Sequence, residues 1–228
     1  MKKLRGLLVI VTSVFVFSDG SAQSLSLSGD VSVVSTYVWR GVRQFNGSAV
    51  QGTVGASFNA LSFGVWASNV NFGDDTLIET DPFVEIALPT GELLSSLGLV
   101  YYSYDFTSFN DQADGEIELY GTLGYGPAGV AVYFVPSQGS TEKDVSDSFY
   151  WITAGVALPV GKSELSVGYE FGTYSARFLP DPTEDAMGVF VLGWARPVTE
   201  DVSISWNYVV PSESQIDNSL WIGLSVGY

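Results

Sequence analysis

The last ten residues of the chain, Ser219 to Tyr228, alternate between apolar and small or polar side chains. Successive side chains of an extended strand point to opposite faces. One face therefore carries the apolar residues Leu220, Ile222, Leu224, Val226 and Tyr228. Almost the whole chain after Gln23 repeats this period of two, and the breaks fall at clusters of Gly, Pro, Asn and Asp. The sequence predicts an all-β protein, with no convincing helix.

The predicted strands number twelve, and the connections between them alternate in length. Every second connection is a short turn, whereas the others are mostly longer, polar and acidic. An even number of strands with short turns at one end is typical of membrane barrels, in which a closed sheet pairs every backbone group. We therefore expect residues 23–228 to form a transmembrane antiparallel up-and-down β-barrel, with the last strand beside the first. No repeat of fixed period indicates a solenoid or a propeller.

The first 22 residues have the three parts of a secretory signal peptide. Basic residues up to Arg5 precede an apolar run from Leu7 to Phe17, and small residues from Gly20 to Ala22 follow it. The run is too short to span a membrane as a helix, which makes a retained anchor the weaker alternative. We predict cleavage after residue 22, export through the periplasm and a location in the bacterial outer membrane.

Composition excludes several classes of function. The chain has 9 basic and 25 acidic residues, a net charge of -16 and no cysteine, and such a charge argues against a nucleic-acid partner. It has no histidine, which removes the commonest general base and metal ligand. A carboxylate-only mechanism would need a pair that the sequence does not place. We expect no enzyme, no cofactor and no metal, with an outer-membrane enzyme as a weak alternative.

Residues 30–44 read D-V-S-V-V-S-T-Y-V-W-R-G-V-R-Q, and A-V-Q-G at 49–52 and G-V-W-A-S-N-V at 64–70 follow. This stretch resembles the TorF family of porins, in which a segment like S-x-Y-x-x-R-G-x-S-Q precedes P-A-x-Q-G and W-x-S-N. Arg43 stands where Ser is usual, and Ser48 where Pro is usual. The match is specific over residues 30–75 and looser to Tyr125. The resemblance implies an outer-membrane barrel that acts as a porin, and it brings no catalytic residues.

If the apolar face meets lipid, several charged residues point into the lumen by alternation. They are Arg40, Glu79, Asp81, Glu85, Glu116, Glu118 and Glu170. Charge in a lumen is hydrated and tunes selectivity, so six acids against one base predict a preference for cations. The alternative is that the acids are hydrophilic filling, solvated or paired with Arg40. Arg40 itself would form a structural ion pair or contact an anionic group of the solute.

Two groups of aromatic residues differ in their predicted faces. Trp66, Trp151 and Trp221 face the lumen, where they would stack on sugar rings or pack within a narrow bore. Tyr37 and Trp39 fall on the lipid face near the end of a first strand predicted over Leu25–Arg40, and Tyr228 ends the chain. We expect these last three at the level of the lipid headgroups.

The function that we predict is a porin-like channel for passive diffusion of small hydrophilic solutes or ions, with a preference for cations. A non-conducting structural or adhesin barrel is the main alternative, because twelve strands lie between small filled barrels and open porins. Expected partners are outer-membrane lipid and lipopolysaccharide, small hydrophilic solutes, and the barrel assembly machinery at the C-terminal strand. The acids of the longer loops would form a solvated mouth in preference to a binding site for divalent cations or lipopolysaccharide. Alternation alone does not tell whether a loop folds into the pore.

Overall fold

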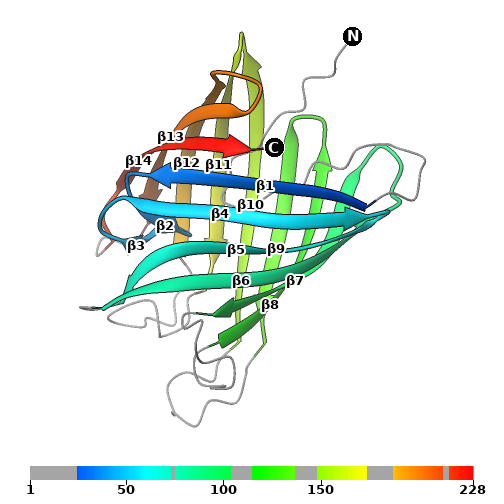
Figure 1. Cartoon of the computed structure of the whole chain (residues 1–228), viewed down its shortest axis with the longest axis horizontal. Coiled ribbons are helices and arrows are strands. Elements are labelled where there is room, and N and C mark those ends of the chain that lie inside the picture. Colours follow the sequence, from blue (N-terminus) through cyan, green and yellow to red (C-terminus); the bar gives the residue numbers. More distant parts are fainter. Residues whose placement is uncertain are drawn as a thin grey trace.

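The computed structural model describes residues 25–72, 75–103, 115–136, 148–173, 187–212 and 216–227. The predicted signal peptide lies outside these residues. Within them all regular structure is β-strand, and no helix has the length and apolar character to cross a membrane. Twelve strands form one closed barrel (Figure 1). They are β1 (Leu25–Val34), β4 (Ala49–Phe58), β5 (Leu61–Phe72), β6 (Asp75–Leu88), β7 (Leu94–Ser103), β8 (Gly115–Tyr125), β9 (Ala128–Val135), β10 (Phe149–Val160), β11 (Ser163–Gly172), β12 (Met187–Pro197), β13 (Val202–Pro211) and β14 (Ser219–Gly227).

The barrel closes between its first and last strands. From β4 to β14 each strand pairs antiparallel with the next in sequence, and β1 pairs with both β4 and β14. The seam runs in register from Asp30 opposite Gly227 to Val34 opposite Gly223. The predicted twelve-strand antiparallel barrel is therefore confirmed, together with the place of its last strand.

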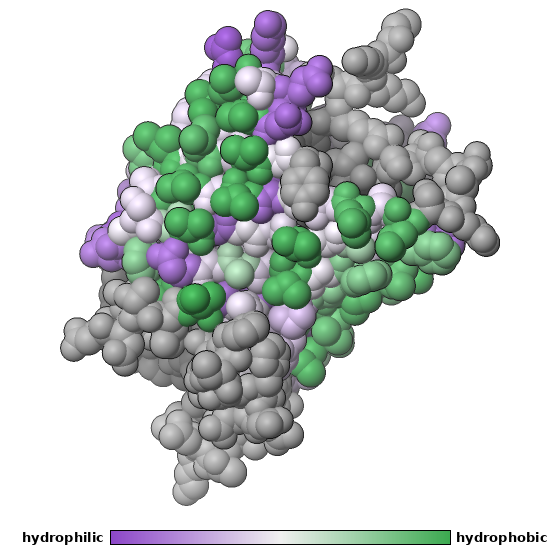
Figure 2. Space-filling model, in the orientation of Figure 1, coloured by the Kyte–Doolittle hydropathy of each residue, from purple (hydrophilic) through white to green (hydrophobic). Residues whose placement is uncertain are grey.

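The outer surface of the barrel is apolar. On β14, Leu220 and Ile222 keep 60% and 62% of their surface exposed, whereas Trp221 between them keeps 7%. Figure 2 shows such hydrophobic residues gathered in patches over the outer side of the molecule. An apolar outer face on a closed barrel is the architecture of outer-membrane proteins, because lipid then covers the face and no sheet edge is left unpaired.

The first strand is shorter than predicted, because the chain leaves the wall after Val34. Residues 37–45 form a separate two-stranded hairpin of β2 (Tyr37–Trp39) and β3 (Val42–Phe45). Its two-residue loop, Arg40 and Gly41, has φ angles of 49° and 81°. Positive φ at both central residues is the requirement of a type I′ turn, which suits a tight hairpin and explains the glycine.

The β2–β3 hairpin lies inside the barrel. The ring of Tyr37 packs 5.5 Å from the ring of Trp66 on β5. Trp39 makes an edge contact with Tyr102 on β7, with 5.9 Å between ring centroids. The hairpin therefore touches wall strands well beyond its neighbours β1 and β4.

Apolar side chains of the opposite wall receive the tip of the hairpin. Val189 and Val191 on β12 and Val209 on β13 are buried in one hydrophobic cluster with the hairpin. A Cβ at Gly41 would lie 2.8 Å from Cγ2 of Val189 and 3.4 Å from Cγ of Pro211. The backbone of the hairpin tip therefore packs directly against side chains of the opposite wall.

Replacing Gly41 with Ala tests how tightly the tip is seated. A side chain in the left-handed region costs about 1 to 2 kcal/mol, and the added methyl group must also displace Val189. We expect a lower free energy of unfolding, measured by urea titration of the protein in lipid vesicles.

Gly91→Ala is the matched control, because Gly91 also has positive φ, at 73°, but a Cβ there meets no atom within 4 Å. Gly91→Ala should lower the free energy of unfolding only by the cost of a side chain at positive φ. Equal losses in the two variants would contradict a tightly packed tip.

Candidate functional site

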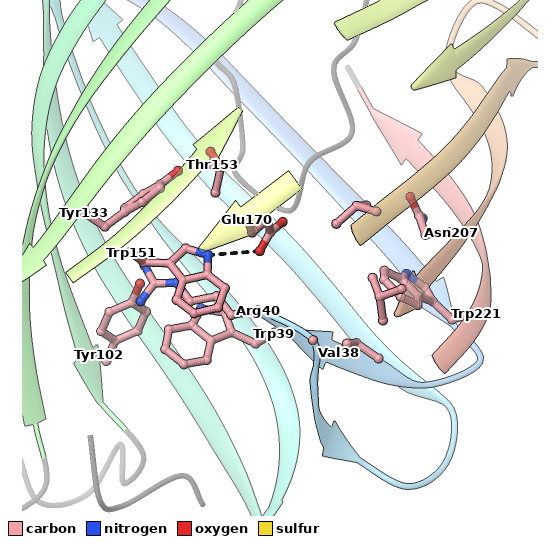
Figure 3. A pocket seen from close by; sticks show the side chains of 13 residues that line it. Val38, Trp39, Arg40, Tyr102, Tyr133, Trp151, Thr153, Glu170, Asn207 and Trp221 are labelled. Atoms are coloured by element: carbon pink, nitrogen blue, oxygen red, sulfur yellow. Dashed lines mark hydrogen bonds between the residues drawn. The ribbon is translucent and has the colours of Figure 1, made fainter. Parts of the chain in front are cut away.

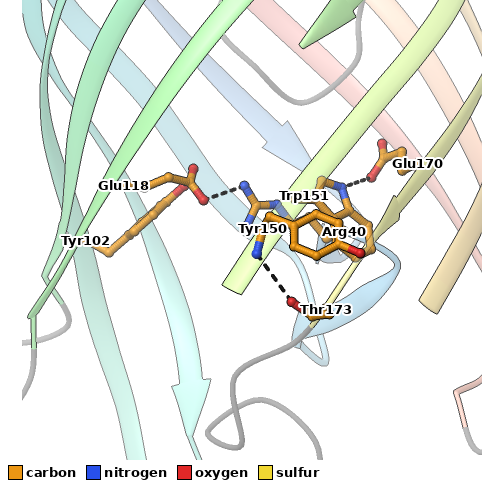
Figure 4. Close-up of polar contacts among 7 residues, drawn as sticks. All are labelled: Arg40, Tyr102, Glu118, Tyr150, Trp151, Glu170 and Thr173. Carbon is orange, nitrogen blue, oxygen red and sulfur yellow. Dashed lines mark hydrogen bonds and ion pairs between the residues drawn. The ribbon is translucent and has the colours of Figure 1, made fainter. Parts of the chain in front are cut away.

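Arg40, at the tip of the hairpin, forms an ion pair inside the barrel (Figure 4). Its Nη2 donates to Oε2 of Glu118 on β8 over 2.6 Å, and the side chains of Arg40 and Glu118 are only 7% and 1% exposed. The hydroxyl of Tyr102 on β7 donates to Oε1 of the same carboxylate over 2.8 Å. Glu118 therefore joins the hairpin to two wall strands.

Aromatic rings surround the Arg40 guanidinium. Its central carbon lies 4.3 Å from the ring centroid of Trp39, 4.9 Å from Tyr133 and 5.6 Å from Trp151. A guanidinium stays protonated in proteins and is attracted to the faces of such rings within about 6 Å. One carboxylate and three rings together hold this cation.

A cavity of about 60 Å³ lies beside Arg40 (Figure 3). Glu170 on β11 borders it and accepts a hydrogen bond from Nε1 of Trp151 over 3.0 Å. Arg40 lies between Glu118 and Glu170 in Figure 4. Further lining residues come from β10, β13 and β14, among them Thr153, Asn207 and Trp221. The cavity thus combines the Arg40 guanidinium and a carboxylate with an amide, a hydroxyl, and phenol and indole rings.

The structure places all of the predicted lumen acids inside the barrel, each with no more than 9% of its surface exposed. On β6 they are Glu79, Asp81 and Glu85, on β8 Glu116 and Glu118, and on β11 Glu170. Glu118 and Glu170 lie near Arg40, whereas Glu85 is hydrogen-bonded by Tyr120 and Ser96. Among the described residues no three carboxylates converge to hold a metal ion. Selection of cations by these acids stays a prediction.

The three tryptophans expected in the lumen also lie inside the barrel. Trp151 and Trp221 are 1% and 7% exposed and border the cavity. Trp66 packs against Tyr37 of the hairpin. Their stacking on sugar rings stays a prediction, while packing against the hairpin is what Trp66 does in the structure.

The interfacial assignment of Tyr37 and Trp39 is wrong. Tyr37 is only 4% exposed and belongs to the buried cluster, and Trp39 packs on Tyr102 and Arg40. The physical reason is that the hairpin turns both side chains away from lipid and into the lumen. Tyr228 lies outside the described residues, so its predicted interfacial position is not described.

Sequence reasoning missed several residues of the site. Tyr133 faces inward between the outward residues Val132 and Phe134, so alternation along β9 would have found it. Tyr102 lies on a strand whose apolar residues fall on both faces, and its direction became clear only from pairing with Glu116 on β8.

Comparison with known proteins places the chain among bacterial barrels. The model of a family described as "Bacterial protein of unknown function (Gcw_chp)" matches residues 18–222. Among curated proteins no relative matches the chain. The resemblance to the TorF family stays a sequence-based prediction, because the matching model carries a different name.

Two solved structures are similar in fold. One, described as "Unveiling the Mechanism Behind the in-meso Crystallization of Membrane Proteins", has a TM-score of 0.56 and 13% identity, and the match covers 89% of this chain and 83% of that one. The other, the NanC porin in a rhombohedral crystal form, has a TM-score of 0.54 and 10% identity, with 89% and 98% covered. At such identities the likeness shows the shared barrel fold and nothing about solutes.

Proposed function

We propose that this chain, which belongs to the Gcw_chp family of bacterial proteins of unknown function, is an outer-membrane channel for passive diffusion of small hydrophilic solutes or ions. The observation that carries the proposal is a closed twelve-strand barrel with an apolar outer surface and charged side chains inside. Lipid, lipopolysaccharide and the barrel assembly machinery are the partners that we propose with this location.

The interior supports a preference for cations. Buried acids extend along β6, β8 and β11, and Arg40 is the one basic side chain that the described residues place among them. Rings of Asp and Glu select cations in other channels. Toward the end with short turns, small inward side chains lie beside the larger Glu85 and Tyr120. The small ones include Ser62, Ser96, Ala157 and Ser166.

A non-conducting barrel is the second candidate, and the inserted hairpin is the observation that favours it. The Arg40–Glu118 pair ties the hairpin across the lumen, and a plugged lumen would suit a structural or adhesin role. Catalysis is not part of our proposal, because the chain lacks histidine for proton transfer.

Conductance in planar bilayers separates the two candidates. We expect stepwise current increases on insertion and, under a potassium chloride gradient, a reversal potential of the sign for cations. Asp81→Asn should bring that potential closer to zero, because it removes a buried lumen acid. Asp201→Asn is the matched control, since Asp201 lies exposed in the turn between β12 and β13.

Repeated insertions without current would contradict the channel and favour the non-conducting barrel. A current that prefers anions would contradict the selectivity alone. An equal shift in the Asp201→Asn control would show that Asp81 acts through overall charge and not through its position in the lumen.

A further inference from the structure

The interior of the barrel already holds one cation, the Arg40 guanidinium. The groups that contact it show which side chains of the barrel wall can bind a cation. The Arg40 guanidinium is bound by a hydrogen-bonded carboxylate, Glu118, and by the faces of aromatic rings. Charged N–H groups satisfy both kinds of contact at once, because they donate to a carboxylate while the delocalised charge lies over a ring. The Arg40 guanidinium is therefore bound inside the barrel as a free guanidinium ligand would be.

The cavity that Arg40 borders contains these same rings together with a second carboxylate. Trp151 contributes a wall to both places, and its indole N–H bonds Glu170 at 3.0 Å. Trp221 adds a second indole, and Asn207 and Thr153 add oxygen atoms that can accept hydrogen bonds. Glu170 is therefore a carboxylate next to an aromatic ring in the cavity, and Glu118 is a carboxylate in the same kind of position beside Arg40.

The size of the cavity suits a small polar group. A bound water needs about 10 to 15 Å³ of such space, so a cavity of about 60 Å³ has room for about four to six waters. A guanidinium group has four heavy atoms, and its plane can lie against the face of an indole ring. A primary ammonium group is smaller and fits as well.

Charge favours a cation in this cavity. Arg40 is paired with Glu118, and the other basic residues of the described chain, Arg43, Lys162 and Arg196, are exposed. Arg40, which borders the cavity, therefore faces two buried carboxylates, Glu118 and Glu170, and the three groups together carry one net negative charge. A carboxylate away from water is stabilised by a bound cation or loses its charge by protonation.

We propose that the cavity beside Arg40 binds small organic cations that carry N–H donors, of the guanidinium or primary ammonium class. Glu170 accepts their hydrogen bonds, and Trp151 and Trp221 pack against their faces. Such cations are the solutes that the channel passes most readily. This last step rests on the proposed function, whereas the binding does not.

Tryptophan fluorescence of the folded protein in detergent measures binding directly. We expect methylguanidinium to give a saturable change at constant ionic strength, and methylurea, a neutral molecule of similar shape, to give none. Glu170→Gln should weaken binding at least tenfold. Glu164→Gln is the matched control, because Glu164 lies near the start of the same strand, six residues from Glu170, and does not border the cavity. It should bind as the wild type does.

Three results would overturn the site: no saturable change with the wild type, equal responses to methylguanidinium and methylurea, or undiminished binding by folded Glu170→Gln. If that variant does not fold, the reversal potential of the wild-type channel tests the site instead. It is measured with methylguanidinium chloride on one side of the bilayer and tetramethylammonium chloride on the other. We expect methylguanidinium to be the more permeant ion, because tetramethylammonium has no N–H donor. Equal permeation would overturn the site, whereas binding without any current would contradict only the channel.

Discussion

Glu118→Gln is expected to lower the free energy of unfolding by about 3 to 5 kcal/mol, the usual cost of leaving one buried charge without its partner. Arg40 would stay charged beside a neutral amide in a place where its side chain is only 7% exposed. Tyr102 would also lose the charged acceptor of its hydroxyl hydrogen bond. Urea unfolding in lipid vesicles, followed by tryptophan fluorescence, measures the loss.

A double-mutant cycle isolates the ion pair from the rest of the site. Arg40→Met removes the charge and keeps an unbranched side chain, and the double variant Arg40→Met/Glu118→Gln removes both charges of the pair together. We expect the double variant to be more stable than the sum of the single losses predicts. Glu164→Gln, which removes a less buried carboxylate on β11, should change stability little. Additive losses would contradict the coupling between Arg40 and Glu118.

Leu224→Arg is expected to impair assembly of the barrel. Leu224 lies on β14 between Val33 of β1 and Ile204 of β13, with 48% of its surface exposed on the outer face. A cation at the bilayer midplane on the lipid face costs about 2 to 4 kcal/mol. The fraction of protein from outer membranes that shows heat-modifiable migration in electrophoresis measures the effect.

Ser225→Arg is the matched control, because Ser225 is the next residue of β14 and faces the other way. A charge in the lumen stays hydrated, so this variant should assemble nearly as well as the wild type. Normal assembly of Leu224→Arg would contradict the outward face of β14 and the lipid around it.

Much of the site could be predicted from alternation, because a strand in a barrel wall has only two faces. Glu118 was expected inside since Ile117 and Leu119 flank it, and in the structure it is fully buried while they are exposed. The same rule placed Glu170 and Trp221 correctly. Alternation predicts that these side chains face the lumen, but it does not predict the distances between them.

The hairpin shows where alternation stops being informative. Apolar and polar residues alternate through Tyr37 and Trp39 whether the chain continues in the wall or turns inside, because a hairpin also has two faces. The Arg40-Gly41 pair was the available signal for a tight turn, since such turns need positive φ. The destination of that turn depends on Glu118, 78 residues away.

The sequence by itself determined a twelve-strand barrel with an apolar outside and an acidic inside, because lipid and lumen impose opposite requirements on neighbouring side chains. Only the tertiary structure decided that the β2–β3 hairpin fills part of the lumen and that Arg40 lies between Glu118 and Glu170. Those positions depend on contacts between residues far apart in the chain, and the local pattern of a strand carries no information about such contacts.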